Sequence, residues 1–322
     1  MRRFVFLVLL LCLVASITGC SKQSNTTSSS TTDVKLAILA PGASDFWKIV
    51  EAGADKAAEE LGVSCEVIAP SQPGATEQKT RLEDLIARGV DGIAFAPVDP
   101  NNQIAAIDKA ASQTNLITTD TDAPKSKRLC YVGTDNYAAG KLAGEELKKA
   151  LPNGGKVWVC VGMLDAQNAH DRYQGVVDAV KGTKINILGV LTDNADRTKA
   201  KANVEDQLVK TPDIAAFVGL WSYNGPAILD ALIAAKKIGK VKIICFDEDA
   251  ATIEAVKKGS IEATVVQNPF EFGYQSVKVL TALAKKEDAG IPESKVIDTG
   301  ARVINKSNVG EFEAEFKKMV GK

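Results

Sequence analysis

The sequence has a single histidine, His170, and lacks the cysteine pairs and basic clusters that mark metal, redox or nucleic-acid sites. Its formal net charge is −1, and no run of lysine and arginine occurs in the body of the chain, which argues against a nucleic-acid surface. No GxGxxG or Walker pattern follows any predicted strand, so nucleotide binding is not supported. His170 has no apparent serine or cysteine partner. We interpret it as an exposed helix residue and predict no catalytic residues.

The cysteines show neither a CxxC motif nor a Cys/His cluster, so the sequence predicts no metal site and no cofactor. Four of them, Cys65, Cys130, Cys160 and Cys245, lie in or beside apolar runs in the body of the chain. We interpret these four as small buried hydrophobic residues. An extracytoplasmic compartment would also permit a disulfide, and the sequence leaves this open.

Residues 1–19 have the features of a lipoprotein signal peptide. Arg2 and Arg3 precede an apolar run over 4–14, which is shorter than a membrane span. The run leads into Ile17-Thr18-Gly19-Cys20, which resembles a bacterial lipobox. That resemblance implies cleavage before Cys20 and a diacylglycerol on its sulfur. A buried N-terminal helix or an uncleaved anchor is the alternative, but no amphipathic stripe or stop-transfer pattern accompanies the run.

Residues 20–33 consist mostly of serine and threonine and contain almost no apolar side chain. Such a segment buries too little surface to offset its ordering entropy, so we predict a flexible tether. A lipid on the mature N-terminus holds a protein at a membrane without spanning it. We therefore expect an extracytoplasmic, periplasmic monomer whose membrane contact is made through the lipid anchor only.

From Val34 onward, short apolar stretches alternate with helical stretches, and this rhythm runs through the chain twice. The first run predicts strands over 34–40, 65–69, 92–96, 116–119 and 128–132, with helices over 46–61, 76–88 and 101–114. The second predicts strands over 156–161, 186–191, 215–219 and 241–246, with helices over 136–150, 167–180, 200–210, 225–235 and 250–258. A strand over 264–266, a helix over 269–283 and an irregular crossing segment complete the prediction.

Apolar strands followed by amphipathic helices are typical of parallel sheets that are covered on both faces. Two such runs predict an α/β fold with two doubly wound, Rossmann-like lobes. A single barrel of eight βα units is less favoured, because the end of the chain does not repeat the unit. The predicted lobes comprise 34–134 plus 268–299 and 135–267 plus 300–322. Three chain crossings are the predicted hinges: Thr134/Asp135, Gln267/Asn268 and Thr299/Gly300.

Open parallel sheets bind ligands beyond the carboxyl ends of their strands. Planar polar groups and aromatic rings follow almost every predicted strand, a mixture that suits sugars, since amides and carboxylates bind hydroxyls and rings cover C–H faces. The candidate ligand-binding residues are Ser44, Phe46, Trp47, Asp120, Thr121, Asp122, Asn168, Arg172, Trp221, Tyr223, Asn224, Asp247 and Gln267. Gly140 and Gly144 are interpreted as sites of close helix packing.

Two segments, Val34–Leu61 and Asp120–Gly144, resemble the ribose-binding-protein group of type I periplasmic binding proteins, and the likeness extends over residues 34–304. The resemblance assigns ligand contacts to residues that match the family pattern: Ser44, Phe46, Trp47, Asp120, Arg172 within Asn168–Gly175, Asp247 after Phe246, and Gln267. Thr121 stands where the ribose-binding member has arginine, which counts against ribose itself. An asparagine of the family is replaced by Trp221 or Ser222 and an aromatic by Ala195, so Trp221 is expected to supply the missing ring.

The resemblance implies a binding protein that closes on a monosaccharide or sugar alcohol and delivers it to an ABC transporter permease. A sensor that presents its ligand to a receptor is a variant of this function. The effector domain of a transcription repressor is disfavoured by the signal sequence and by the lack of a helix-turn-helix before Val34. A secreted glycoside-acting enzyme is the third alternative, since paired carboxylates occur at Asp120/Asp122 and Asp247/Glu248/Asp249.

Overall fold

The computed structural model describes residues 34–71 and 74–319, which belong to one compact unit. The predicted signal sequence, the lipidation site Cys20 and the tether lie outside the described residues. Within the described ranges, no helix has both the length and the apolarity that crossing a membrane requires.

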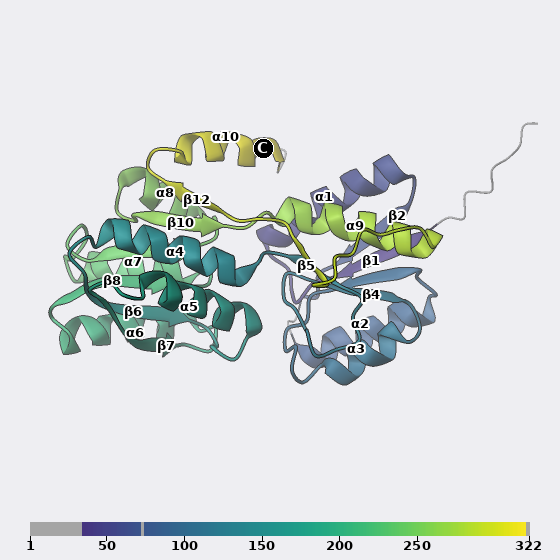
Figure 1. Cartoon of the computed structure of the whole chain (residues 1–322), viewed down its shortest axis with the longest axis horizontal. Helices are drawn as coiled ribbons and strands as arrows, with labels where there is room; N and C mark the ends of the chain where they lie inside the picture. The colour runs from purple at the N-terminus through teal and green to yellow at the C-terminus, as the bar shows by residue number, and fades with distance from the viewer. Residues whose placement is uncertain (1–33, 72–73, 320–322) are drawn as a thin grey trace, which may run out of the picture. The chain divides into compact units, whose positions relative to one another are not determined.

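The first lobe is built on a parallel sheet of six strands in the order β11-β5-β4-β3-β1-β2. Its strands are β1 (Lys35–Leu39), β2 (Ser64–Ile68), β3 (Gly92–Phe95), β4 (Asn115–Thr119), β5 (Tyr131–Gly133) and β11 (Val296–Asp298). Its helices are α1 (Asp45–Leu61), α2 (Ala75–Ala87), α3 (Ile104–Ala111) and α9 (Pro269–Lys285). Figure 1 shows α1 and α9 on one face of this sheet and α2 and α3 on the other.

The second lobe repeats this plan in the order β12-β10-β9-β8-β6-β7, with β12 antiparallel to β10. Its strands are β6 (Gly155–Val161), β7 (Ile185–Thr192), β8 (Ile214–Gly219), β9 (Lys242–Phe246), β10 (Ala263–Val266) and β12 (Arg302–Asn305). Its helices are α4 (Asn136–Ala150), α5 (Gln167–Val180), α6 (Arg197–Lys210), α7 (Asn224–Ala234), α8 (Ala250–Lys258) and α10 (Val309–Met319). The predicted α/β fold with two doubly wound parallel lobes is confirmed.

The cores lie on both faces of each sheet, as the continuously apolar strands require. Cys130, Cys160 and Cys245 are buried in these cores, and Cys65 is partly buried. All four are free thiols in the described part of the chain. Burial raises the pKa of the Cys130 thiol to about 11, which favours the unreactive protonated form.

The end of the chain is more regular than the sequence predicts. The segment expected to be irregular forms β11, β12 and α10. The two strands, of three and four residues, are too short to leave a clear periodic pattern. Conversely, α3 begins only at Ile104, although the predicted helix starts at Asn101. The turn before it is held by side-chain hydrogen bonds: Asp99 accepts from the Asn102 amide, and Gln103 accepts from the Asp99 amide. These local bonds replace the first helical turn.

Each lobe contains one helix pair whose backbones touch at glycines. A Cβ atom on Gly53 of α1 would lie 1.9 Å from the carbonyl oxygen of Phe270, and one on Gly273 of α9 would lie 1.9 Å from that of Val50. In the second lobe, a Cβ on Gly140 of α4 would lie 2.2 Å from the carbonyl oxygen of Arg172 in α5. Figure 1 shows α4 and α5 close together over the second sheet. This close approach fixes the backbone of Arg172.

The chain passes between the two sheets at three places, after β5, after β10 and after β11. Two of these linkers are tied together, because a carboxylate oxygen of Asp298 accepts hydrogen bonds from the amides of Asp135 (2.8 Å) and Gly300 (3.0 Å). The linkers after β5 and β11 are therefore connected to each other.

Candidate ligand-binding site

Asp120 and Asp247 occupy equivalent places, one residue after β4 in the first lobe and one after β9 in the second. Both have left-handed backbones, with φ of 59° and 66°. The Asp247 amide donates to Val265 at 2.9 Å, and its carbonyl oxygen accepts from the Thr264 hydroxyl at 2.7 Å. The carbonyl oxygen of Asp120 accepts from the Tyr131 hydroxyl at 2.9 Å. Strained backbones held by such bonds are typical of functional sites.

Arg172 is the basic side chain that faces these carboxylates, and it is only 2% exposed. Its Nε donates to Oδ1 of Asn136 at 2.8 Å, and its Nη1 donates to the carbonyl oxygen of Leu220 at 2.7 Å. The guanidinium carbon lies 4.4 Å from the centre of the Phe246 ring. The guanidinium is therefore fixed by hydrogen bonds and by stacking before any ligand binds.

Charges from both lobes act on one another across this region. Burial raises the pKa of Asp120 to about 6, with Asp247 adding to the effect and the positive charge of Arg172 opposing it. Burial also raises the pKa of Asp247, again opposed by Arg172. Glu248 has its pKa raised to about 8, first by burial and then by the charge of Asp247. Carboxylates from two lobes thus converge on one arginine.

Seven polar side-chain atoms around the strand ends and linkers are buried without a hydrogen-bond partner among the described residues. They are Thr119 Oγ1, Thr134 Oγ1, Asn168 Oδ1, Trp221 Nε1, Glu248 Oε2, Gln267 Oε1 and Thr299 Oγ1. Buried polar atoms normally have partners, so a cluster of unpaired donors and acceptors indicates a binding site. The other end of Gln267 is already engaged, because its Nε2 donates to Oδ1 of Asp247 at 2.8 Å.

The three candidates after β8 form one network with a residue that the sequence did not point to. Asp193, at the end of β7, accepts hydrogen bonds from the Tyr223 hydroxyl and from Nδ2 of Asn224 (3.2 Å). Asn224 in turn accepts from the amide of Trp221 at 2.9 Å. The family pattern drew attention to Ala195, where an aromatic residue is replaced, but not to Asp193, which lies two residues earlier. The one sequence signal for Asp193 is a carboxyl group directly after a strand.

Asp122 has a different environment from Asp120. Its carboxylate accepts from Nε and Nη2 of Arg128, the latter at 2.6 Å, and from the Thr118 hydroxyl at 2.7 Å. Both oxygens are thus engaged by the protein, which favours a structural role; ligand binding by Asp122 stays a prediction. Its neighbour Thr121 is partly buried and donates its hydroxyl to Asp120 at 3.3 Å.

The aromatic pair at the start of α1 divides between surface and core. Phe46 is half-buried and meets Trp47 and Phe272 edge to face, with ring centres 5.8 Å apart in both pairs. Trp47 is 5% exposed and packs in the core of the first lobe. Ser44 precedes the helix and is exposed, and its side chain makes no capping bond. Ser44 and Trp47 line a shallow cavity at the start of α1, and ligand contacts by Ser44, Phe46 and Trp47 stay predictions.

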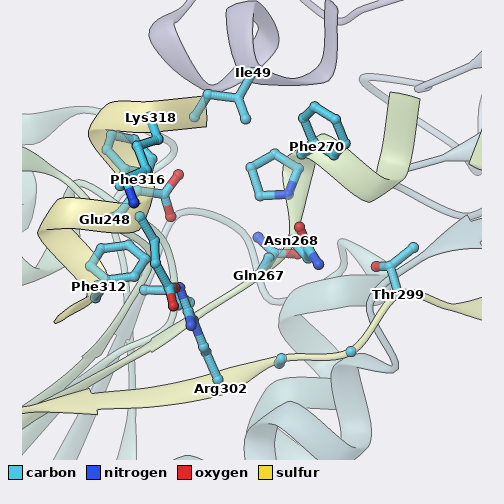
Figure 2. Close-up of a pocket in the computed structure, with 15 residues that line it drawn as sticks. Ile49, Glu248, Gln267, Asn268, Phe270, Thr299, Arg302, Phe312, Phe316 and Lys318 are labelled. Carbon is cyan, nitrogen blue, oxygen red and sulfur yellow. The ribbon is translucent and has the colours of Figure 1, made fainter. Parts of the chain in front are cut away.

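A cavity of about 580 Å³ lies beside the linkers and is lined by both lobes. Figure 2 shows Ile49 and Phe270 of the first lobe facing Phe316 of α10, with Gln267 near the centre. Glu248 also lines this cavity. The cavity therefore reaches the same linker residue that hydrogen-bonds Asp247.

His170 is exposed, and its Nδ1 lies 3.5 Å from a carboxylate oxygen of Asp171. In residues 34–71 and 74–319, no three His, Cys, Asp or Glu side chains are grouped so as to hold a metal ion.

Two α/β lobes joined by three linkers, with polar and aromatic side chains at their strand ends, define a two-lobed binding protein. A family model described as periplasmic binding protein domain matches residues 36–288. The chain belongs to this family, within its ribose-binding-protein-like group of sugar-binding proteins of ABC transporters.

Individual relatives match this chain over most of their length, and the solved structures share its fold. The ribose import binding protein RbsB of Salmonella typhimurium is 30% identical over 246 residues, which cover 75% of this chain and 81% of that protein. The crystal structure of GanP, a glucose-galactose binding protein from Geobacillus stearothermophilus, has a TM-score of 0.80 and 34% identity, covering 85% of this chain and 98% of that one. The XylFII–LytSN complex contains a chain with a TM-score of 0.76 and 25% identity, covering 85% and 98% respectively.

Proposed function

We propose that this protein is an extracytoplasmic solute-binding protein that captures a small sugar between its lobes and delivers it to an ABC transporter permease. The observation that carries the proposal is the convergence of Asp120 from one lobe with Arg172 and Asp247 from the other. Each carboxylate can accept hydroxyl protons from a sugar, and the guanidinium donates to sugar oxygens. We infer binding without catalysis.

A ligand that contacts both lobes binds the closed arrangement better and shifts the protein toward it. The binding arginine is connected to a linker, because Asn136 accepts from Arg172 and donates from Nδ2 to the carbonyl oxygen of Thr134 at 3.1 Å. Hinge closure is a known motion of periplasmic binding proteins. We propose the linkers at 134–135, 267–268 and 299–300 as the hinges and the closed form as the state that the permease recognises.

The class of ligand is proposed from the site and the relatives together. Unpaired buried donors and acceptors, taken together with the aromatic rings of Trp221 and Phe46, suit a sugar ring with hydroxyls on its edge and C–H groups on its face. RbsB is named for ribose, and GanP for glucose and galactose. We expect a monosaccharide or sugar alcohol, and Thr121 makes ribose the less favoured choice.

A thermal-shift screen of residues 33–322 against pentoses, hexoses, sugar alcohols and amino acids tests this assignment. A ligand at about 100 times its Kd adds about 2.7 kcal/mol to the folded state and raises Tm by several degrees. A shift with one sugar class supports the proposal. A shift with amino acids only would retain the binding function and overturn the sugar assignment.

Anchoring through Cys20 is a separate part of the proposal and rests on the lipobox-like sequence. Cys20→Ala should release the protein from the membrane fraction, and metabolic labelling with a tagged fatty acid should label only the unsubstituted chain. Equal membrane retention of both proteins would overturn the anchor.

Presentation of the ligand to a receptor protein is a second candidate. Its support is the similarity to XylFII, which has been crystallised in a complex with LytSN. Sugar uptake by cells that lack this protein separates the two functions: lost uptake supports transport, whereas normal uptake with a lost transcriptional response supports sensing.

A further inference from the structure

Asp193 is a buried carboxylate, and both side chains that donate hydrogen bonds to it contact Trp221. The residue is 1% exposed and lies directly after β7. Its Oδ1 accepts from the Tyr223 hydroxyl and from the Ala195 amide at 2.9 Å, and its Oδ2 accepts from Nδ2 of Asn224 at 3.2 Å. Both oxygens are therefore occupied by protein donors, so Asp193 acts through its neighbours.

Those neighbours hold Trp221 from two directions. Asn224, which is fully buried, accepts from the Trp221 amide at 2.9 Å and so fixes the backbone of the loop after β8. The ring of Tyr223 meets the Trp221 ring edge to face, with centres 6.3 Å apart and planes at 70°. Removing the carboxylate would leave both partners without their acceptor and release these two constraints together.

The backbone of Gly162 limits the position of the Trp221 ring from a third side. A Cβ atom on Gly162, after β6, would lie 2.0 Å from Cζ3 of Trp221 and 2.8 Å from the Tyr223 hydroxyl. Only glycine lets the indole ring lie this close to the strand end. Residue 220, next to the tryptophan, is held by Arg172, whose Nη1 donates to the Leu220 carbonyl at 2.7 Å.

The indole N–H of Trp221 is buried and has no acceptor among the described residues. An indole nitrogen can only donate, so its partner must offer a lone pair. Trp221 comes shortly after β8, which pairs with β9, and Asp247 directly follows β9, so the two residues belong to neighbouring strand ends. A sugar hydroxyl or ring oxygen bound there meets this requirement.

We propose that Asp193 is a positioning residue that, through Tyr223 and Asn224, orients Trp221 so that its indole N–H donates a hydrogen bond to an oxygen of the bound sugar and thereby helps to select the ligand. This inference rests on the proposed sugar-binding function and adds a residue and a specific donor to it.

The first measurement needs no ligand. The full chain, purified in detergent and labelled with 5-fluorotryptophan, should give separate ¹⁹F signals for Trp47, Trp158 and Trp221, assigned through Trp221→Phe. Asp193→Ala should shift or broaden the Trp221 signal and leave the other two unchanged. An unchanged Trp221 signal would overturn the positioning role whether or not any sugar binds.

The second measurement uses D-glucose, D-galactose, D-ribose and D-arabinose, and then the monodeoxy forms of the sugar that binds most tightly. Trp221→Phe keeps a ring and removes the donor, so affinity should fall about tenfold, and less for the one deoxy sugar that lacks the acceptor. Asp193→Ala should reproduce this selectivity change, and the double variant should be no weaker than Trp221→Phe alone. Equal losses for every deoxy sugar, or additive losses, would overturn the inference.

Asp196→Ala is the matched control. Asp196 lies in the same loop and accepts from the amides of Thr198 and Lys199, capping α6 without contacting Trp221. It should lower Tm and leave both the Trp221 signal and the sugar selectivity unchanged. If the unsubstituted protein binds none of the pentoses, hexoses and sugar alcohols of the thermal-shift screen, the sugar assignment fails and the indole donor to a sugar fails with it, while the fluorine signals still decide whether Asp193 orients Trp221.

Discussion

Asp120 and Asp247 share a left-handed backbone conformation at equivalent strand ends of the two lobes, with φ of 59° and 66°. This conformation costs a residue with a side chain about 1 kcal/mol relative to glycine. Both carboxylates are also held in a buried region in which Arg172 is the nearby cation. The protein therefore keeps two acidic residues in strained backbone conformations at the strand ends where we propose that a ligand binds.

Replacing Asp120 with glycine should separate stability from binding. We expect the free energy of unfolding of the ligand-free protein to rise by about 1 kcal/mol, because the strain and the buried charge are both removed. Affinity for the sugar should fall by about tenfold or more, since a charged hydrogen-bond acceptor is lost. Chemical denaturation and calorimetric titration measure the two effects.

Lys236→Gly is the control for backbone strain. Lys236 also has a left-handed backbone (φ 56°), is exposed and lies at the end of α7. It should gain similar stability with no change in affinity. If Asp120→Gly destabilises the protein while Lys236→Gly stabilises it, the strain at Asp120 is not the dominant contribution.

Asp122→Asn tests whether this candidate is structural. Asp122 and Arg128 form a largely buried ion pair, with 15% and 6% of their side chains exposed. Removing the charge should lower the free energy of unfolding by about 3 kcal/mol, because Arg128 is left buried and uncompensated. Affinity measured well below Tm should stay within about twofold of wild type. A tenfold loss of affinity with unchanged Tm would instead support the ligand contact that the sequence predicts.

Glu248 should make stability depend on pH. Its pKa is raised from 4.5 to about 8, so the folded state favours the protonated carboxyl. The stability that it contributes is full below pH 4.5 and is lost as pH rises through 8. Glu248→Gln should therefore match wild type at pH 5 and exceed it by about 1–2 kcal/mol at pH 8.5, a discounted value because the side chain is only partly buried.

Denaturation curves at several pH values measure this difference in a ligand-free sample. A constant difference between the two proteins across the range would show that Glu248 does not titrate there. Glu262→Gln is a useful comparison, because it removes a half-buried carboxylate that is paired with Lys242 in another part of the second lobe.

Trp47 and Phe46 should behave differently. Trp47→Leu should lower the free energy of unfolding by about 2 kcal/mol through lost core packing, with affinity changed less than threefold. Phe46→Leu should cost less stability and weaken sugar binding by about tenfold, because the half-buried ring is expected to contact the ligand. Thermal unfolding measures the change in stability, and titration calorimetry measures the change in affinity. A larger loss of affinity for Trp47→Leu than for Phe46→Leu would place the ligand against Trp47.

The sequence by itself determined the fold class, because alternating apolar strands and amphipathic helices are local patterns that survive without knowledge of their partners. Helices such as α5 have the predicted limits, Gln167–Val180. The same reasoning selected Asp120, Arg172 and Asp247 as candidates, since carboxyl ends of parallel strands meet at one edge and family motifs mark these positions. It missed β11, β12 and α10, whose stability comes from pairing and packing with distant segments rather than from their own pattern.

Only the tertiary structure decided what each strand-end residue does. Asp120 and Asp122 are two residues apart in sequence, yet one faces Arg172 of the other lobe and the other is paired with Arg128 of its own. Asp193 becomes a candidate positioning residue only because Tyr223 and Asn224, some thirty residues later, donate hydrogen bonds to it. The partner of each of these carboxylates depends on distances between side chains of different helices and strands. The spacing of residues along the sequence does not give those distances.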